Sequence, residues 1–154
     1  MAKNWGCYAA GSECYNNDPA NCATYGRLYD WATAMSVCPS GWHIPNDDEW
    51  DELVSYVESY WGCSDCAARY LKSRNDWSSG GNGVDKFGFA ALPGGNGGSD
   101  GNFYNVGGSG SWWSASEYYA DGAYLRGMSY YEESVGRYSG GKSVNLLSVR
   151  CVKD

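Results

Sequence analysis

The sequence predicts a single α+β domain with two helices, antiparallel strands and long glycine-rich loops. Three observations support this fold class: apolar residues recur at helical spacing before residue 62, glycine dominates residues 78–111, and short alternating runs fill the chain from residue 112 onward. Helices followed by strands are typical of α+β domains and not of alternating parallel units. A length of 154 residues and an aromatic content of 16% suit one domain with its own core.

The first helix is predicted over residues 26–36, after an irregular segment at 1–25. Leu28, Trp31, Ala32 and Met35 fall on one face at helical spacing, and a proline and a glycine at 39 and 41 end the helix.

The second helix has the clearest start in the chain. Asn46 is the predicted N-cap, and Glu49 follows three residues later as in a capping box. The apolar stripe of this helix covers about fifteen residues and is expected to face the core. It consists of Trp50, Leu53, Val54, Val57 and Trp61.

The glycine-rich region is expected to form ordered loops folded onto the core, because Phe87, Phe89, Phe103 and Tyr104 need burial. Strands are predicted at residues 87–92, 112–116, 123–132, 135–138 and 144–152, with a hairpin turn at 139–142 between the last two. The expected core consists of Trp31, Trp50, Leu53, Val57, Phe89, Trp112, Leu147 and Val149.

Composition excludes some classes of function and favours others. The formal charge of −7 argues against a nucleic-acid partner, and no apolar run is long enough for a membrane span. Seven cysteines are typical of an exported domain. Residues 1–25 contain no signal peptide, so we expect a chain that has lost its leader or was excised, and a location outside the cell or at its surface.

Two cysteine pairs are close in sequence. Cys14 and Cys22 can close a small loop around turn-forming residues. Cys63 and Cys66 form a CxxC motif; a redox function would require a thioredoxin-like context, and a zinc site would require a second ligand pair. Because neither is present, a local structural disulfide is the favoured interpretation.

No catalytic or cofactor set is predicted. His43 is the only histidine, and we expect it to form hydrogen bonds at the entry to the second helix. We therefore expect no enzyme activity and no cofactor. Calcium remains an open alternative because the glycine-rich loops offer hard oxygen ligands, although these residue types are more often turn formers. The candidate ligands are Asp85, Asn96, Asp100 and Asn102.

The C-terminal strands carry the candidate binding surface. Seven of the fourteen tyrosines lie between Tyr104 and Tyr138, interleaved with arginine and glutamate. Alternation puts Tyr124, Arg126, Met128 and Tyr130 on one face of a strand, so some of these side chains cover the core. The rest exceed what one sheet face requires, and Tyr and Arg are typical of binding surfaces. The predicted ligand-binding residues are Tyr118, Tyr119, Tyr124, Arg126, Tyr130, Tyr131, Arg137 and Tyr138.

Several long motifs resemble the Fibrobacter succinogenes major paralogous domain, and the order of elements resembles the C-type lectin fold. The motifs are Asn17-Asp18-Pro19-Ala20-Asn21-Cys22, Tyr25-Gly26-Arg27-Leu28-Tyr29, Cys38-Pro39-Ser40-Gly41-Trp42-His43-Ile44-Pro45, Gly88-Phe89-Ala90-Ala91-Leu92-Pro93-Gly94-Gly95, Trp112-Trp113-Ser114 and Ser148-Val149-Arg150-Cys151.

The resemblance implies one C-type-lectin-like domain over residues 1–154 that lacks a leading strand. It also implies a bridge between Cys38 and Cys151, which leaves Cys7 unpaired because the cysteine count is odd. We expect a non-catalytic module that binds carbohydrate or protein through its C-terminal strands and loops. The alternative is a structural subunit of an extracellular homo-oligomeric or filamentous assembly, favoured by the missing strand, the odd cysteine and an apolar-rich surface.

Overall fold

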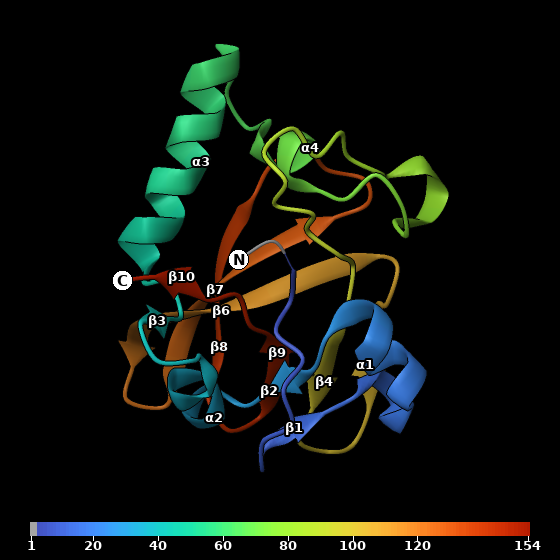
Figure 1. Cartoon of the computed structure of the whole chain (residues 1–154), viewed down its shortest axis with the longest axis vertical. Coiled ribbons are helices and arrows are strands. Elements are labelled where there is room, and N and C mark those ends of the chain that lie inside the picture. Colours follow the sequence, from blue (N-terminus) through green and yellow to red (C-terminus); the bar gives the residue numbers. More distant parts are fainter. Residues whose placement is uncertain (1–2) are drawn as a thin grey trace.

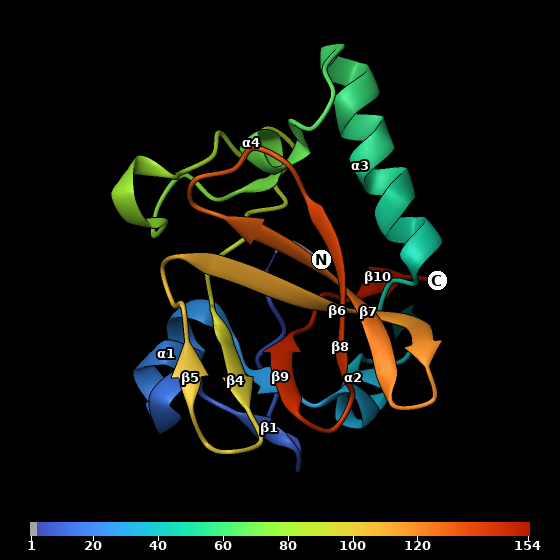
Figure 2. The ribbon, with the colours of Figure 1, turned by 180° about the vertical axis from the view of Figure 1, so that it is seen from behind.

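A computed structural model describes residues 3–154 and confirms a mixed α+β architecture (Figure 1). The larger sheet lies in the middle of the molecule, and α3 runs along one side of it with its C-terminal end projecting beyond the rest (Figures 1 and 2). The described residues contain four α-helices where two were predicted: α1 (Pro19–Tyr25), α2 (Trp31–Val37), α3 (Asp47–Trp61) and α4 (Ala67–Leu71). The strands are β1 (Ser12–Glu13), β2 (Leu28–Tyr29), β3 (Trp42–His43), β4 (Asn96–Gly98), β5 (Phe103–Tyr104), β6 (Ser109–Tyr119), β7 (Gly122–Ser129), β8 (Gly136–Gly141), β9 (Asn145–Ser148) and β10 (Val152–Lys153).

The larger sheet is mixed, whereas the sequence predicted antiparallel strands only. Its strand order is β1-β2-β9-β6-β7-β8, and β4 adds to β9 and pairs with β5. The β6–β9 contact is parallel, at Trp112 and Ser148, and the other strand pairs of this sheet are antiparallel. A second, smaller sheet pairs β3 with β10.

The predicted helix at 26–36 begins later than expected. Leu28 and Tyr29 form β2, whose partners β1 and β9 are remote in sequence. The helix then begins after Asp30, whose carboxylate accepts a hydrogen bond from the Thr33 amide at 2.8 Å. The buried face is also different from the predicted one, because Ala34 is buried while Met35 is exposed.

Two further helices were not predicted. Residues 1–25 were expected to be irregular, but Asp18 caps α1 and Pro19 occupies its first turn, which are common helix-start signals. The short α4 follows the end of α3 closely, and its Ala67, Ala68 and Leu71 are fully buried.

The second predicted helix is confirmed as α3. The Asn46 side chain accepts from the Glu49 amide at 2.9 Å, and the Glu49 carboxylate accepts from the Asn46 amide at 2.8 Å, which completes the capping box. Gly62 ends the helix in the left-handed conformation with φ of 63°, where glycine carries no Cβ penalty.

The predicted strand at 87–92 is wrong. Ala91 forms only an isolated bridge with Lys72. Single backbone hydrogen bonds connect residues 83–91 to residues 69–73 without forming a continuous ladder, and Ala90 interrupts the extended backbone with a left-handed φ of 49°. The glycine-rich region does fold onto the body of the protein, and it contains the unpredicted hairpin of β4 and β5. Phe87 and Tyr104 remain exposed, contrary to expectation, while Phe103 is half-buried against Tyr15.

The C-terminal region departs from the predicted pattern in two ways. The strand predicted at 144–152 is divided into β9 and β10, which belong to different sheets. The predicted hairpin turn at 139–142 is also wrong, because β8 continues to Gly141 and pairs with β7, while β9 pairs with β2, β4 and β6. The strands predicted at 112–116, 123–132 and 135–138 are found as β6, β7 and β8 with shifted ends.

The core has two parts, separated by the sheet strands β6 and β7. One part packs α3 and α4 against Trp112 and Met128, and the other packs α2 and Ile44 against Trp113 and Val149. Of the predicted core residues, five are buried and three are half-buried. The buried ones are Trp50, Val57, Trp112, Leu147 and Val149, and the half-buried ones are Trp31, Leu53 and Phe89.

Candidate functional site

Four predicted binding residues gather where the β6–β7 hairpin meets β8. The Tyr118 ring centroid lies 4.0 Å from that of Tyr119 and 5.0 Å from that of Tyr124. The Arg137 guanidinium lies over the Tyr124 ring at 3.9 Å, a cation–π arrangement. We call these four residues the hairpin-end group.

Tyr118 and Tyr119 of the hairpin-end group border a hollow of about 270 Å³. Its floor is glycine and serine from the ends of β7 and β8, and Asp121 lies on its rim beside Tyr118 and Tyr119. The pKa of Tyr119 is raised because its hydroxyl shares a hydrogen bond with Tyr118. Tyr119 is largely accessible to a ligand, since 62% of the residue is exposed.

The other three predicted binding tyrosines form a second group, which we call the far-end group. Tyr130 and Tyr131 follow the end of β7, and Tyr138 in β8 lies opposite Leu125 with its ring extended over Gly127. The rings of Tyr130 and Tyr131 meet edge to face at 5.1 Å, and 72% of Tyr131 is exposed. Tyr131 and Tyr138 line a hollow of about 110 Å³ over Gly127 and Met128, with Glu132 beside it. A further hollow of about 160 Å³ lies on the other side of Tyr130 and Tyr131.

A buried lysine supports the far-end group from below. The Lys72 ammonium donates to the backbone carbonyls of Ser129 at 3.0 Å and of Glu132 at 2.9 Å, and it lies over the Trp77 ring. Burial lowers its pKa, while Glu133 and Glu132 oppose that shift. The contacts fix the turn that presents Tyr130 and Tyr131.

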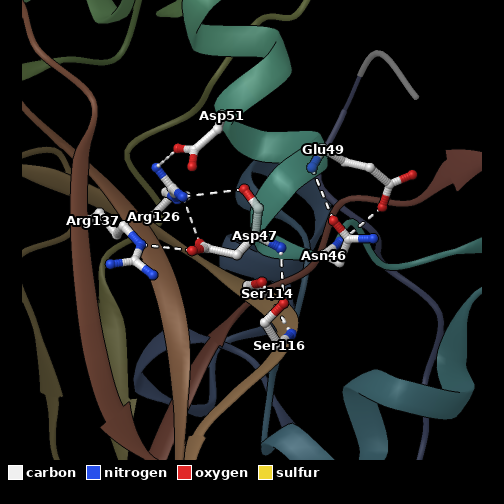
Figure 3. Close-up of polar contacts among 8 residues, drawn as sticks. All are labelled: Asn46, Asp47, Glu49, Asp51, Ser114, Ser116, Arg126 and Arg137. Atoms are coloured by element: carbon white, nitrogen blue, oxygen red, sulfur yellow. Dashed lines mark hydrogen bonds and ion pairs between the residues drawn. The ribbon is translucent and has the colours of Figure 1, made fainter.

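The remaining predicted binding residue, Arg126, is not at the surface. Only 3% of it is exposed, and its guanidinium donates to the Asp47 carboxylate at 2.5 Å and pairs with Asp51 at 2.9 Å (Figure 3). The same Asp47 carboxylate accepts from Arg137 Nε at 2.6 Å, which raises the pKa of Arg137. This arrangement offers the ligand no direct contact with Arg126; it ties β7 and β8 to the start of α3.

The start of α3 is also tied to β6. The Asp47 amide donates to the Ser116 hydroxyl at 3.0 Å, and the Ser116 amide donates to the Ser114 hydroxyl at 3.2 Å (Figure 3). One aspartate in the first helical turn therefore contacts all three strands that carry the candidate site. This aspartate was not predicted as a site residue, since its partners lie 69 to 90 positions away in the chain.

A second group of rings, exposed except for the half-buried Tyr70, lies where α3 meets α4, and sequence reasoning missed it. Its members are Tyr56, Tyr60, Trp61, Tyr70 and Phe87, and we call it the α3–α4 corner. Trp61 was predicted to belong to the buried stripe, but it is exposed on one side and stacked on Tyr70 on the other, at 4.5 Å. A signal was present, because Tyr56 and Tyr60 are spaced four residues apart outside the apolar stripe.

His43 lies where the sequence placed it, at the entry to α3. Its Nε2 is 2.9 Å from the Glu49 carboxylate and its Nδ1 is 2.6 Å from the Asp154 carboxylate. Hydrogen bonds to Asp154 and Glu49 raise the pKa of His43. The two carboxylates hold the imidazole as a structural contact between α3 and the C-terminal segment.

The predicted disulfides are all present. Cys14 bonds to Cys22, Cys38 to Cys151, and Cys63 to Cys66; Cys7 is an exposed free thiol. The Cys38–Cys151 bridge closes 113 residues and is worth roughly 4–5 kcal/mol by chain entropy. The Cys63–Cys66 bridge lies in the link between α3 and α4, next to the α3–α4 corner.

The candidate calcium ligands are engaged in local turn contacts. Asp85 accepts from the Ala90 amide at 2.8 Å, and Asp100 accepts from the amide and the side chain of Asn102. Asn96 lies in β4. Over residues 3–154, no group of three or more His, Cys, Asp or Glu side chains is placed to hold a metal ion.

These features define an α+β domain stapled by three disulfides, with tyrosines displayed at both ends of a three-stranded part of its sheet. The chain belongs to the Fibrobacter succinogenes major domain family, whose profile matches residues 2–153. No curated protein and no solved structure matches the chain.

Proposed function

We propose that this domain is a non-catalytic binding module that works outside the cell or at its surface. Its ligand, a carbohydrate or a protein, contacts the tyrosines at the two ends of strands β6, β7 and β8. The observation that carries this proposal is the exposure of Tyr118, Tyr119, Tyr130, Tyr131 and Tyr138 on strands or tight turns of the sheet in a disulfide-stapled domain.

Tyrosine suits this task for a physical reason. A phenol ring has few rotatable bonds, so fixing it against a ligand costs little conformational entropy, and it offers both an apolar face and a polar hydroxyl. The ion pairs of Asp47 with Arg126 and Arg137 fix the strands before any ligand arrives. A surface organised in advance spends less free energy on ordering when it binds.

Two observations support the location and the fold that we infer. Three disulfides are typical of oxidising compartments, and no helix within residues 3–154 is long and apolar enough to cross a membrane. The bridge from the end of α2 to Cys151, just before β10, supports a C-type-lectin-like arrangement, as the motifs imply.

The alternative function is a structural subunit of an extracellular homo-oligomeric or filamentous assembly. The observation that favours it is the exposed α3–α4 corner together with the free thiol of Cys7. Solution mass measured over a wide concentration range separates the two: a constant monomer mass supports the binding module, and growth into large polymers supports the subunit.

The binding proposal is tested with a glycan array and a panel of secreted and surface proteins. A ligand found there is then titrated into the wild-type domain and into two double variants, Tyr118→Ala with Tyr119→Ala, and Tyr130→Ala with Tyr131→Ala. At least one double variant should weaken binding roughly tenfold or more while melting like the wild type. A ligand that binds both variants as tightly as the wild type contradicts the proposed site.

A further inference from the structure

Strand β8 is the outer edge of the larger sheet, and no strand within residues 3–154 pairs with its outward side. The side chains of Val144 and Asn145 lie against its last two glycines only. It pairs with β7 alone, over Gly136 to Gly141. In the described part of the chain, the backbone of residues 136–140 forms hydrogen bonds only with β7. In an antiparallel pair every second residue directs its amide and carbonyl away from the partner strand, so this edge presents free donors and acceptors.

The edge is also unprotected. Proteins usually guard a free strand edge with lysine, proline, a bulge or a covering loop, and β8 contains three glycines and neither lysine nor proline. Its two large side chains are turned back onto the sheet. The Tyr138 ring lies so close over Gly127 and Gly136 that a Cβ at either position would press on it, and Arg137 is bound to Asp47.

A hollow lies near each end of this edge. The hollow of the hairpin-end group is floored by Ser139, Gly140 and Gly141, and the hollow of the far-end group is lined by Tyr138. A free edge flanked by pockets is the arrangement used for strand addition, in which backbone bonds supply affinity and the pockets select side chains.

The charges around these hollows select the kind of side chain. Asp121 lies at one hollow and Glu132 at the other, and neither carboxylate forms an ion pair with any of residues 3–154. The nearby cations are already engaged, since Arg137 pairs with Asp47 and Lys142 pairs with Glu117. The buried Lys72 ammonium, below Glu132, is held by the two backbone carbonyls described above. Exposed tyrosine rings beside each carboxylate also favour cations.

The geometry points to an extended peptide segment of a protein partner, rich in Lys or Arg, that adds to β8 as a further strand. This inference rests on the proposed function and selects protein from its two ligand classes. The overall charge of −7 favours approach of such a basic segment.

The test uses a synthetic peptide of about ten residues in which Thr and Lys alternate, a length at the upper end of ordinary strands. It is titrated into the isotope-labelled domain at about 0.15 M salt and followed by amide NMR. We expect shifts and slowed hydrogen exchange at residues 136–141. We expect binding roughly tenfold tighter than that of the matching Thr-Glu peptide.

Two controls separate strand addition from general attraction to an acidic protein. Two Thr-Lys peptides are compared, one N-methylated at every Thr backbone nitrogen and one at every Lys backbone nitrogen. One of the two should bind roughly tenfold more weakly than the other, because the backbone amides of only one residue type face β8. The pair Asp121→Asn with Glu132→Gln should weaken binding severalfold. The matched pair Glu52→Gln with Glu58→Gln, which removes the same charge from α3, should leave binding unchanged.

Four results would overturn the inference. The first is equal binding of all methylated peptides, and the second is equal weakening by the two charge-removing pairs. The third is a concentration-dependent mass of the domain alone with residues 136–141 protected from exchange, since a second copy would then occupy the edge. The fourth is that the Thr-Lys peptide does not bind while a glycan binds through the tyrosines. In that case this inference is wrong and the proposed function stands.

Discussion

The molecule displays aromatic rings in two regions that differ in how the rings are used. At the ends of β6, β7 and β8 the tyrosines form small groups beside hollows, over floors of glycine and serine. At the α3–α4 corner the five rings form one connected cluster, in which Phe87 contacts both Tyr56 and Tyr60, and Trp61 lies flat on Tyr70.

The difference indicates different roles for similar side chains. The corner rings contact one another where the end of α3 projects from the body of the protein (Figure 1), so they supply the packing that this end of the helix otherwise lacks. The strands of the tyrosine groups are fixed instead by the Asp47 ion pairs (Figure 3). Their rings can therefore be removed without loosening the sheet, and we expect corner substitutions to change stability and sheet substitutions to change affinity.

The largest effect should come from Asp47→Ala, which breaks the connection between α3 and the candidate site. It leaves Arg126 buried with the exposed Asp51 as its only ion-pair partner, beside the backbone carbonyl of residue 47. Loss of one member of a buried ion pair costs about 3–5 kcal/mol. Denaturant unfolding measures the change. The control Asp48→Ala removes an exposed carboxylate from the same helical turn and should cost less than about 1 kcal/mol.

The second prediction concerns Trp61→Ala at the corner. This change removes the stacked contact with Tyr70 and the edge contact with Tyr60, and it should lower the free energy of unfolding by about 1–2 kcal/mol. Affinity for a ligand of the sheet should stay the same. A large loss of affinity with unchanged melting would instead make the corner the binding surface, and the roles of the two regions would be reversed.

The third prediction is the counterpart at the sheet. Replacing Tyr130 and Tyr131 together by Ala should weaken binding of a ligand roughly tenfold, because exposed anchor rings carry much of a binding energy. Unfolding should change by less than about 1 kcal/mol, since Tyr131 is mostly exposed and Lys72 holds the turn through backbone carbonyls. A variant that unfolds early while its affinity survives would show that these rings pack and do not bind.

Local signals in the sequence predicted local structure well. The capping box of Asn46 and Glu49 and the Cys63–Cys66 bridge each depend on residues a few positions apart, and both are found. The Cys38–Cys151 bridge spans most of the chain, and it was predicted through family resemblance and not from spacing.

Contacts between distant segments explain two of the errors. Leu28 has helical apolar spacing with Trp31, but Leu28 and Tyr29 pair with β9, more than a hundred residues later, and so form a strand. Arg126 alternates with tyrosines as a surface residue would, and its burial depends on Asp47, 79 positions away. Alternation along a strand assigns side chains to faces, but only the fold determines which end of a face meets a helix.

The smallest predicted effect is a pH dependence that belongs to the start of α3 and not to the corner. When protonated, His43 donates to both Glu49 and Asp154, so its pKa in the folded protein is raised above the unfolded value of about 6.5. The folded state then binds more protons, and the stabilisation is complete below that value and is lost as pH rises through the folded pKa. The stability advantage of the wild type over His43→Gln should therefore be larger near pH 6 than near pH 8.5.

The effect is modest because the imidazole is partly exposed to screening solvent. Trp61→Ala, which changes no charge, should lower stability equally at both pH values. An advantage over His43→Gln that is the same at both pH values would show that the two carboxylates do not hold a proton on this histidine.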